Sequence, residues 1–327
     1  MLEDRDELLA RIATLYYYHD QSQQQIAQAL SLSRSNVSRM LKEARERGIV
    51  EISIHYPIAR DFLLEQQIKE RFGLRAAVVV QATPGSDMVT LQKTAQLSAR
   101  MLDEQLDGAK TLAISWGTTV HAIVDLFTPS RRYDVEVVQL MGGVSSDEPA
   151  IDGPSLVARL ARHFSGRYRY LHAPLVVDQP ELATALLGQR NIAEALEAAL
   201  SAEVALVGIG ALEPSVSSLL RAGYLSHEEF AAIVASGAVG DVCARHFDDN
   251  GNPAFPEIDA RVIAITLAQL AAIPTVIGAA CNSAKARAIR GVLRGGYLDI
   301  LVTDSEAAEA VLELDSRLVR TAVLSNL

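Results

Sequence analysis

Cysteine, aromatic residues and unbroken apolar runs are all scarce in this 327-residue chain, and each shortage excludes a class of protein. Two cysteines, Cys243 and Cys281, are too few for a disulfide framework and suit a reducing cytoplasm, where we expect both to be buried thiols. The longest apolar stretch, residues 262–281, is interrupted by Gln269 and Pro274, so we interpret it as strand, short helix, strand. The first residues are acidic, which does not fit a secretory signal. The sequence therefore predicts a cytoplasmic protein with no membrane partner.

Positive charge is also in short supply. The net charge of −10 argues at first against a nucleic-acid binder, because contacts to phosphates need cationic side chains. The deficit is uneven, however: residues 1–60 hold eight Lys or Arg and eight Asp or Glu, so all the net negative charge lies behind them. Residues 33–48 carry a local surplus of positive charge. The chain is thus an acidic protein with one short basic segment near its N-terminus.

Apolar periodicity divides the chain into a small and a large domain. Apolar residues recur at three- and four-residue spacing near the N-terminus, which predicts helices over 7–18, 22–30 and 33–47, with Gly48 ending the third. Alternation over 49–56 predicts a short strand. A further helix over 60–72 is interpreted as a connector. We therefore predict a DNA-binding domain over 1–56, a linker helix over 57–74 and an effector domain over 75–327.

The effector domain is predicted to be α/β. Short runs of β-branched and small apolar residues alternate there with helical segments, which indicates a parallel sheet covered by helices on both faces. The runs expected to form strands are 76–80, 111–115, 135–140, 204–209, 262–266, 275–280 and 300–303.

The segment 23–50, QQQIAQALSLSRSNVSRMLKEARERGIV, predicts a winged helix-turn-helix. Its first helix has an apolar inner face in which the small Ala27 lets a second helix cross closely. Ser33 is a suitable N-cap for that second helix, because its hydroxyl can accept a free backbone N–H. Val37, Met40 and Leu41 then face the core, and the strand after Gly48 serves as a wing.

The outward face of the second helix carries the predicted DNA contacts. Its first turns present Arg34, Ser35, Asn36, Ser38 and Arg39, the part of a recognition helix that reaches base edges in the major groove. Arg can pair with guanine and Asn with adenine through two hydrogen bonds. Further along, Lys42 and Arg45 are expected to contact phosphates, which fixes register without reading sequence. The alternative is a polar helical hairpin whose charged face is merely solvated.

Taken together, these segments resemble the SorC family of sugar-responsive bacterial transcriptional regulators over nearly the whole chain. The N-terminal segment is similar to the DNA-binding motif of that family. Four later stretches are similar to its effector domain: LAISWGTT at 112–119, QLMGG at 139–143, VGIG at 207–210 and KARAIRGVLRGGYLDILVTD at 285–304. The resemblance implies a fold similar to ribose-phosphate isomerases, glucosamine-phosphate deaminases and CoA transferases, used for binding. It also implies a phosphorylated sugar or polyol effector and a homo-oligomer, a dimer or tetramer, on operator DNA.

Two loops that follow predicted strands are candidates for the effector site on their own chemistry. Ser115, Gly117, Thr118 and Thr119 open a helix, where free N–H groups and the helix dipole favour an anion. A simple packing loop is the alternative. Gly142–Gly143 follows the next strand and would border the same crevice at the carboxyl end of a parallel sheet, although turn glycines explain the pair equally well.

The remaining effector residues are assigned by the resemblance. The loop with Gly208 and Gly210 lacks the third glycine of a dinucleotide fingerprint, so we reject a nicotinamide site and predict no cofactor. Similarity places this loop at the effector pocket, with Asp241 facing sugar hydroxyls, although Asp241 could equally cap a helix or serve a turn. It places Lys285 beside a phosphate, with a solvated surface lysine as the alternative.

The sequence departs from the family pattern just before the lysine. Cys281 and Asn282 occupy a position where the family usually has two glycines, so we expect a loop of different shape, since Cys tolerates a left-handed backbone poorly. Met141 is an inert thioether, which excludes a Schiff-base lysine at that position.

Two other functions stay open at this point. The chain could be a sugar-phosphate isomerase or deaminase with an accessory DNA-binding arm, for which Asp241 and His246 are the only acid/base candidates. Alternatively, its ligand could be a sugar or polyol without a phosphate. A calcium loop over 246–257 is rejected in favour of a hairpin turn at residues 249–251, because His246 takes the first ligand position.

Overall fold

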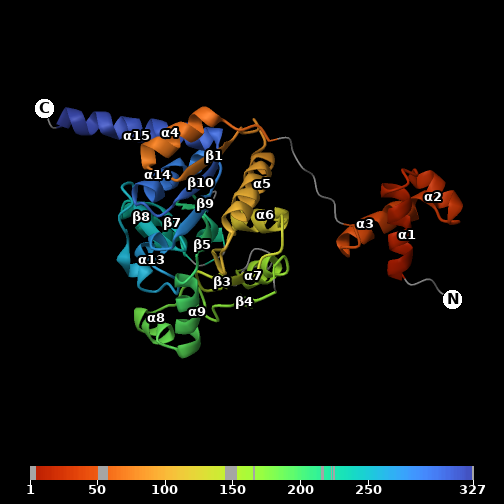
Figure 1. The fold of residues 1–327 in the computed structure, drawn as a ribbon, viewed down its shortest axis with the longest axis horizontal. Coiled ribbons are helices and arrows are strands. Elements are labelled where there is room, and N and C mark those ends of the chain that lie inside the picture. The colour runs from red at the N-terminus through yellow and green to blue at the C-terminus, as the bar shows by residue number, and fades with distance from the viewer. Residues whose placement is uncertain are drawn as a thin grey trace. The chain divides into compact units, whose positions relative to one another are not determined.

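The computed structural model describes residues 5–50, 58–143, 153–164, 166–214, 217–221, 223 and 225–325, with side chains up to Ser316. Contacts between Cα atoms divide the chain into two compact units, Met1–Pro57 and Ile58–Leu327 (Figure 1). Among the described residues, no helix is both long and apolar enough to cross a bilayer.

The small unit is built from three helices, α1 (Arg5–Tyr17), α2 (Gln23–Ala29) and α3 (Arg34–Glu46). These are the three helices that the apolar spacing predicts. Their apolar faces meet in one core, to which Leu9, Ile26, Val37 and Met40 each contribute a buried side chain. The strand predicted over 49–56 falls mostly on residues 51–57, which lie outside the described residues.

Local hydrogen bonds fix where the helices of the small unit begin and end. The hydroxyl of Ser33 accepts from the backbone N–H of Asn36 at 3.1 Å, as its N-cap position predicts. At the other end of α3, Gly48 adopts φ +70°, a conformation that stops the helix and favours glycine. Arg47 then pairs with Asp6 of α1 at 2.7 Å, which ties the end of α3 to the first helix.

Replacing Ser33 with Ala is expected to raise amide hydrogen exchange across α3 about fivefold, because a lost N-cap costs about 1 kcal/mol. Hydrogen–deuterium exchange of the full chain measures this effect. Ser38→Ala is the matched control, since Ser38 lies within α3 on the exposed face. Equal exchange in the two variants would show that the cap hydroxyl contributes nothing.

The large unit is centred on a parallel sheet, which confirms the predicted α/β class. Its strand order is β1-β10-β9-β5-β2-β3-β4, and every pairing in it is parallel. Six of its strands are apolar and largely buried, as the sequence runs predict, whereas the edge strand at residues 168–169 is exposed and was not predicted. The strands are β1 (Ala76–Val80), β2 (Thr111–Ile114), β3 (Glu136–Gln139), β4 (Tyr168–Arg169), β5 (Val204–Gly208), β9 (Thr275–Ala279) and β10 (Ile300–Asp304).

Helices pack against this sheet, among them α5 and α6 on one side of the view in Figure 1. The helices of the large unit are α4 (Phe62–Phe72), α5 (Asp87–Gln105), α6 (Thr118–Leu126), α7 (Gly153–Ala161), α8 (Pro180–Leu187), α9 (Arg190–Leu200), α10 (Ser218–Arg221), α11 (His227–Ala235), α12 (Pro256–Asp259), α13 (Leu267–Ala271), α14 (Ala286–Arg294) and α15 (Ser305–Ser325). The helix proposed as a linker, α4, packs on β1 and buries Leu64 and Ile68 in the core of the large unit. It is therefore an integral part of that unit.

One predicted strand is absent, and a second sheet was not predicted. Residues 262–266 form isolated bridges, of Val262 with Val176 and of Ala264 with Met141, because their backbone carbonyls are used largely by the Arg245 guanidinium. The second sheet is antiparallel and consists of β6 (Gly210–Ala211), β7 (Ala238–Val242) and β8 (Arg245–Asp248). After β8 the chain turns back at residues 249–251, where a hairpin turn was predicted.

Candidate functional site

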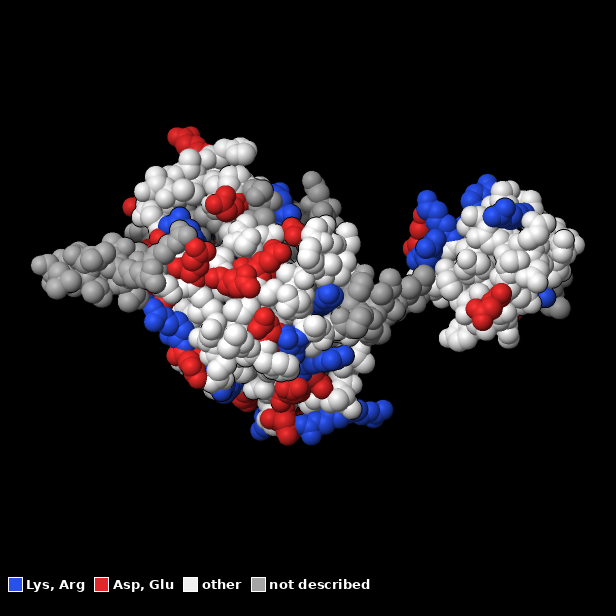
Figure 2. Space-filling view, turned by 90° about the horizontal axis from the view of Figure 1, so that it is seen from above, with Lys and Arg blue, Asp and Glu red and all other residues white. Residues whose placement is uncertain are grey.

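The outer face of α3 carries the side chains predicted to contact DNA. Arg34, Ser35, Ser38 and Arg39 are exposed, and so are Lys42 and Arg45. Asn36 is half-buried, and its side-chain oxygen accepts a hydrogen bond from the guanidinium of Arg39. The helix thus offers a cationic and amide-bearing face to solvent, while its apolar side is buried. Lys and Arg side chains are prominent on the small unit in Figure 2, whereas acidic side chains spread across the visible face of the large unit.

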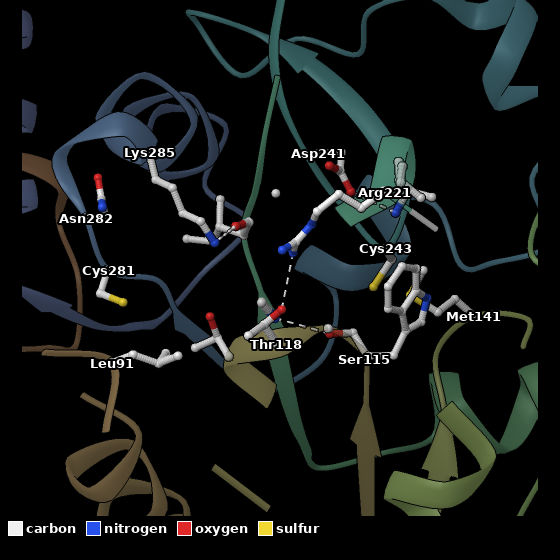
Figure 3. A pocket seen from close by; sticks show the side chains of 18 of the residues that line it. Leu91, Ser115, Thr118, Met141, Arg221, Asp241, Cys243, Cys281, Asn282 and Lys285 are labelled. Atoms are coloured by element: carbon white, nitrogen blue, oxygen red, sulfur yellow. Dashed lines mark hydrogen bonds between the residues drawn. The ribbon is translucent and has the colours of Figure 1, made fainter. Parts of the chain in front are cut away.

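A cavity of about 300 Å³ lies at the carboxyl ends of β2 and β5 in the large unit. Figure 3 shows Lys285, Asp241, Arg221, Thr118 and Ser115 around it. The structure brings most of the predicted effector residues together at its wall. They are Ser115, Gly117, Thr118, Thr119, Gly208, Gly210, Asp241 and Lys285.

One wall of the cavity has the chemistry of an anion site. Helix α6 starts there at Thr118, after Gly117, and the first N–H groups of a helix have no partner within the helix. Arg221, at the end of α10, donates from Nη2 to the Thr118 hydroxyl at 3.4 Å (Figure 3). Ser115 steadies the neighbouring loop, because its hydroxyl accepts from the N–H of Gly208 at 3.1 Å. This wall therefore combines a guanidinium, hydroxyls and helix N–H groups.

Lys285 approaches the cavity from the loop before α14. Its ammonium donates to the carbonyl of Ile209 at 3.0 Å. Burial lowers the pKa of Lys285, while the nearby Cys281 and Asp241 act in the opposite direction. A partly desolvated cation of this kind gains when an anionic ligand enters.

Asp241 is held next to the cavity by the second sheet. The N–H of Ala244 donates to its Oδ2 at 3.2 Å, and burial raises the pKa of Asp241. In the β6–β7 pairing Gly210 lies opposite Asp241, and a Cβ at Gly210 would overlap the carboxylate. Glycine at position 210 is thus required by the placement of this acid.

Comparison with known proteins decides the family. The family model described as “Putative sugar-binding domain” matches residues 56–313, and that of sigma-70 region 4 matches residues 7–47. The deoxyribonucleoside regulator of Bacillus subtilis is 33% identical over 312 residues, covering 95% of this chain and 99% of that protein. The crystal structure of full-length SorC, the sorbitol operon regulator of Klebsiella pneumoniae, is 32% identical with a TM-score of 0.71, covering 94% of this chain and 99% of that one. The chain belongs to the SorC family.

As a SorC-family member, the chain is a transcriptional regulator with a DNA-binding helix-turn-helix and a sugar-binding domain, and not an enzyme. The residues named for the enzyme alternative agree with this conclusion. His246 is buried, its Nδ1 faces Asp259 at 3.5 Å, and it is not part of the cavity wall that holds Asp241. Among the described residues, no group of three or more His, Cys, Asp and Glu could hold a metal ion.

The SorC-family glycine pair Gly142–Gly143 lies away from the cavity wall, which only Met141 of that motif reaches. The N–H of Gly142 donates to the Ile263 carbonyl at 2.8 Å, and a Cβ there would lie 2.5 Å from the Pro174 carbonyl oxygen. The N–H of Gly143 donates to Ala173. These glycines allow a close approach of two backbone segments, and neither of them lines the cavity.

Where the family pattern has two glycines and this chain has Cys281–Asn282, the asparagine adopts the left-handed backbone conformation. Asn282 adopts φ +85°, and its amide bonds both to Asp87, at 2.8 Å, and to the N–H of Ala284, at 2.9 Å. Both cysteines line the cavity, Cys243 buried and Cys281 only partly, and burial raises the pKa of each thiol to about 12. The expectation of two buried thiols thus holds fully for Cys243 alone.

Sequence reasoning missed several cavity residues, above all Arg221 and Trp116. Arg221 lies in a short helix with no motif around it. Only the fold shows that its guanidinium bonds to Thr118 at the cavity. Trp116 lies inside the SWGTT motif, yet nothing in the sequence assigns it a role. Asp87 and Leu91 reach the cavity from α5, which is far away in the sequence. A lone residue brought in by the tertiary fold carries no local signal.

Proposed function

We propose that this regulator controls a carbohydrate catabolic operon and that a phosphorylated sugar or polyol, bound in the 300 Å³ cavity, sets its affinity for operator DNA. The observation that carries the proposal is the convergence of two cations, Arg221 and Lys285, on a cavity that also contains the start of α6. A small cavity with few placed polar groups suits a sugar-sized ligand.

Each wall of the cavity has a separate role in this proposal. Thr118, Thr119, Gly117 and Arg221 bind the phosphate, because guanidinium groups and helix N–H groups both recognise phosphate oxygens. Asp241 accepts hydrogen bonds from sugar hydroxyls, and Lys285 contributes a second positive charge near the anion.

At the other end of the chain, α3 enters the major groove. Arg34, Asn36 and Arg39 contact bases, whereas Lys42 and Arg45 contact phosphates. The regulator acts in the cytoplasm as a homo-oligomer, a dimer or tetramer, that spans paired half-sites. The effector binds one arrangement of the oligomer better than the other and so shifts the population that matches the operator spacing.

A DNA-binding assay with the full-length protein tests this function. The protein is mixed with the DNA upstream of its own gene and with an unrelated duplex, in the presence of a panel of sugar phosphates and the matching free sugars. We expect selective binding to the upstream DNA, falling steeply with salt, and a change in affinity with at least one sugar phosphate. Equal binding to both duplexes in every condition would refute the proposal.

Effector affinity is expected to fall at alkaline pH, and at a lower pH than that at which an ordinary lysine loses its proton. Burial lowers the pKa of Lys285 in the empty cavity, so its proton is lost as pH rises through that lowered pKa. A bound phosphate favours the charged lysine. Above the lowered pKa, Lys285 is neutral in the free protein and must take up a proton when the phosphate binds, which weakens binding. Lys285→Arg should remove this loss, because a guanidinium stays charged. A pH series of equilibrium titrations measures both proteins, and parallel curves would contradict the assignment.

A further inference from the structure

Helix α14 connects the effector cavity with a distant ion-pair cluster. It begins directly after Lys285, whose ammonium lies at the cavity, and it ends nine residues later at Arg294. The second sheet supports it closely along the way: Gly240 of β7 faces Ala288, and Gly291 of α14 faces Phe247. Because the two glycines let α14 pack tightly on β7 and β8, we expect a displacement of the Lys285 end to move the helix together with these strands.

The far end of α14 reaches a buried carboxylate on α15. Asp315, whose side chain is only 3% exposed, accepts from Nε of Arg294 at 2.7 Å and also pairs with Arg71 of α4. Both arginines lower the pKa of Asp315 against the effect of burial, so the acid is charged and shared between two helices. One turn earlier, Arg290 donates to the carbonyl of Leu314, which adds a second connection between α14 and α15. We call Arg71, Asp315 and Arg294 the Asp315 cluster.

Helix α4 is the first helix after residues 51–57, which join the large unit to the DNA-binding unit. The Asp315 cluster holds its C-terminal end. Its N-terminal end is held by Arg60, which donates twice to Glu65, at 2.7 Å each, while Glu65 also accepts from the N–H of Val79 in β1. Besides its apolar packing on β1, α4 thus has a polar attachment at each end, and the one at Asp315 is shared with α14.

The cluster also has room to rearrange. A cavity of about 320 Å³ is lined by its three residues together with Phe72 and Leu293. Long arginine side chains beside an open space can change rotamer without displacing packed neighbours. An ion pair beside such a space can therefore hold two arrangements, which coupling between distant sites requires.

We propose that the Asp315 cluster transmits effector binding from the cavity, through α14, to α4 and so to the chain segment that carries the DNA-binding unit. The proposal rests on the cavity being the effector site. It assigns Arg71 a coupling role, since this residue is not part of the effector cavity wall.

Hydrogen–deuterium exchange of the full chain tests this route with inorganic phosphate as the probe, against potassium chloride of equal ionic strength. Fluorescence of Trp116, the single tryptophan and a cavity residue, reports whether phosphate is bound. In the wild type we expect phosphate to slow exchange in α14 and α4, by about fivefold or more if the coupling has the usual size. In Arg71→Gln, fluorescence and α14 should respond as in the wild type, while the response of α4 is lost.

Lys69→Gln is the matched control, since it removes an exposed positive charge from the same helix and should leave the response of α4 intact. Asp315→Asn weakens both ion pairs and should also abolish the response of α4. This second variant shows that the loss does not depend on the choice of one substitution. A response of α4 in Arg71→Gln equal to the wild type would overturn the coupling role. If phosphate changes neither Trp116 fluorescence nor exchange around residues 115–119, the effector site itself is wrong, and this inference fails with it.

Discussion

Replacing Arg34 with Ala is expected to weaken binding to the specific operator by roughly tenfold to a hundredfold and to relax the preference for one base pair. Arg34 is exposed in the first turn of α3, directly after the Ser33 cap, which is the turn that reaches base edges in a major groove. A guanidinium that pairs with guanine contributes only at its own base pair, so DNA without the operator should be bound nearly as before.

Lys42→Ala provides the contrast within the same helix. Lys42 is exposed two turns further along and is expected to contact a phosphate, so its loss should weaken binding to every duplex alike and lower the salt slope by about one. Fluorescence anisotropy with labelled operator and random duplexes, at several salt concentrations, separates the two effects. Lys110→Ala, in the large unit, is the control. If Arg34→Ala lowered affinity for both duplexes equally, Arg34 would be a phosphate contact.

The small unit was predictable because its signals are local. Helix spacing, the Ser33 cap and the Gly48 stop all act within a few residues of the feature that they determine, and the structure contains each of them. Six strands of the parallel sheet were predictable for the same reason, since a short apolar run is enough to indicate a buried strand, whereas the exposed β4 carries no such run and was not predicted.

Features that depend on distant partners were not predictable. The run 262–266 has a strand-like composition, but Arg245 occupies carbonyls that a neighbouring strand would have used. In β7, Gly240 and Asp241 interrupt an otherwise apolar segment, because one faces α14 and the other the cavity. The sequence shows a glycine at position 142 but not why it is there. Only the fold shows that a Cβ at this position would overlap the backbone carbonyl of Pro174.

The same distinction applies to the cavity. Motif residues such as Thr118 and Lys285 were found because they follow strands or match a family pattern. In the structure both line the same cavity. Arg221 was missed, although it supplies the guanidinium beside Thr118. Polar groups that converge from separate segments form a site whose chemistry only becomes visible in three dimensions.

Replacing Arg221 with Ala is expected to weaken the binding of a sugar phosphate by about tenfold to a hundredfold, because a hydrogen bond to a charged group is worth about 1.5–3 kcal/mol. Lys285→Ala should have a similar effect, while the matching free sugar or polyol should bind both variants about as well as the wild type. Titration followed by Trp116 fluorescence measures all of these affinities without a label. A ligand that binds more tightly without its phosphate, and that ignores both substitutions, would instead establish a neutral polyol as the effector.

The double variant then shows whether the two cations bind the same group. If Arg221 and Lys285 both contact one phosphate, the second substitution should cost much less or much more than it does alone, because residues that share a partner are not additive. If Lys285 instead serves the opposite end of the sugar, next to Asp241, the two losses should add. We expect non-additivity, because both cations are assigned to the phosphate: Arg221 bonds to Thr118 at the start of α6, and Lys285 reaches the same cavity with its ammonium bonded to the Ile209 carbonyl. Additive losses would therefore move Lys285 from the phosphate to the sugar.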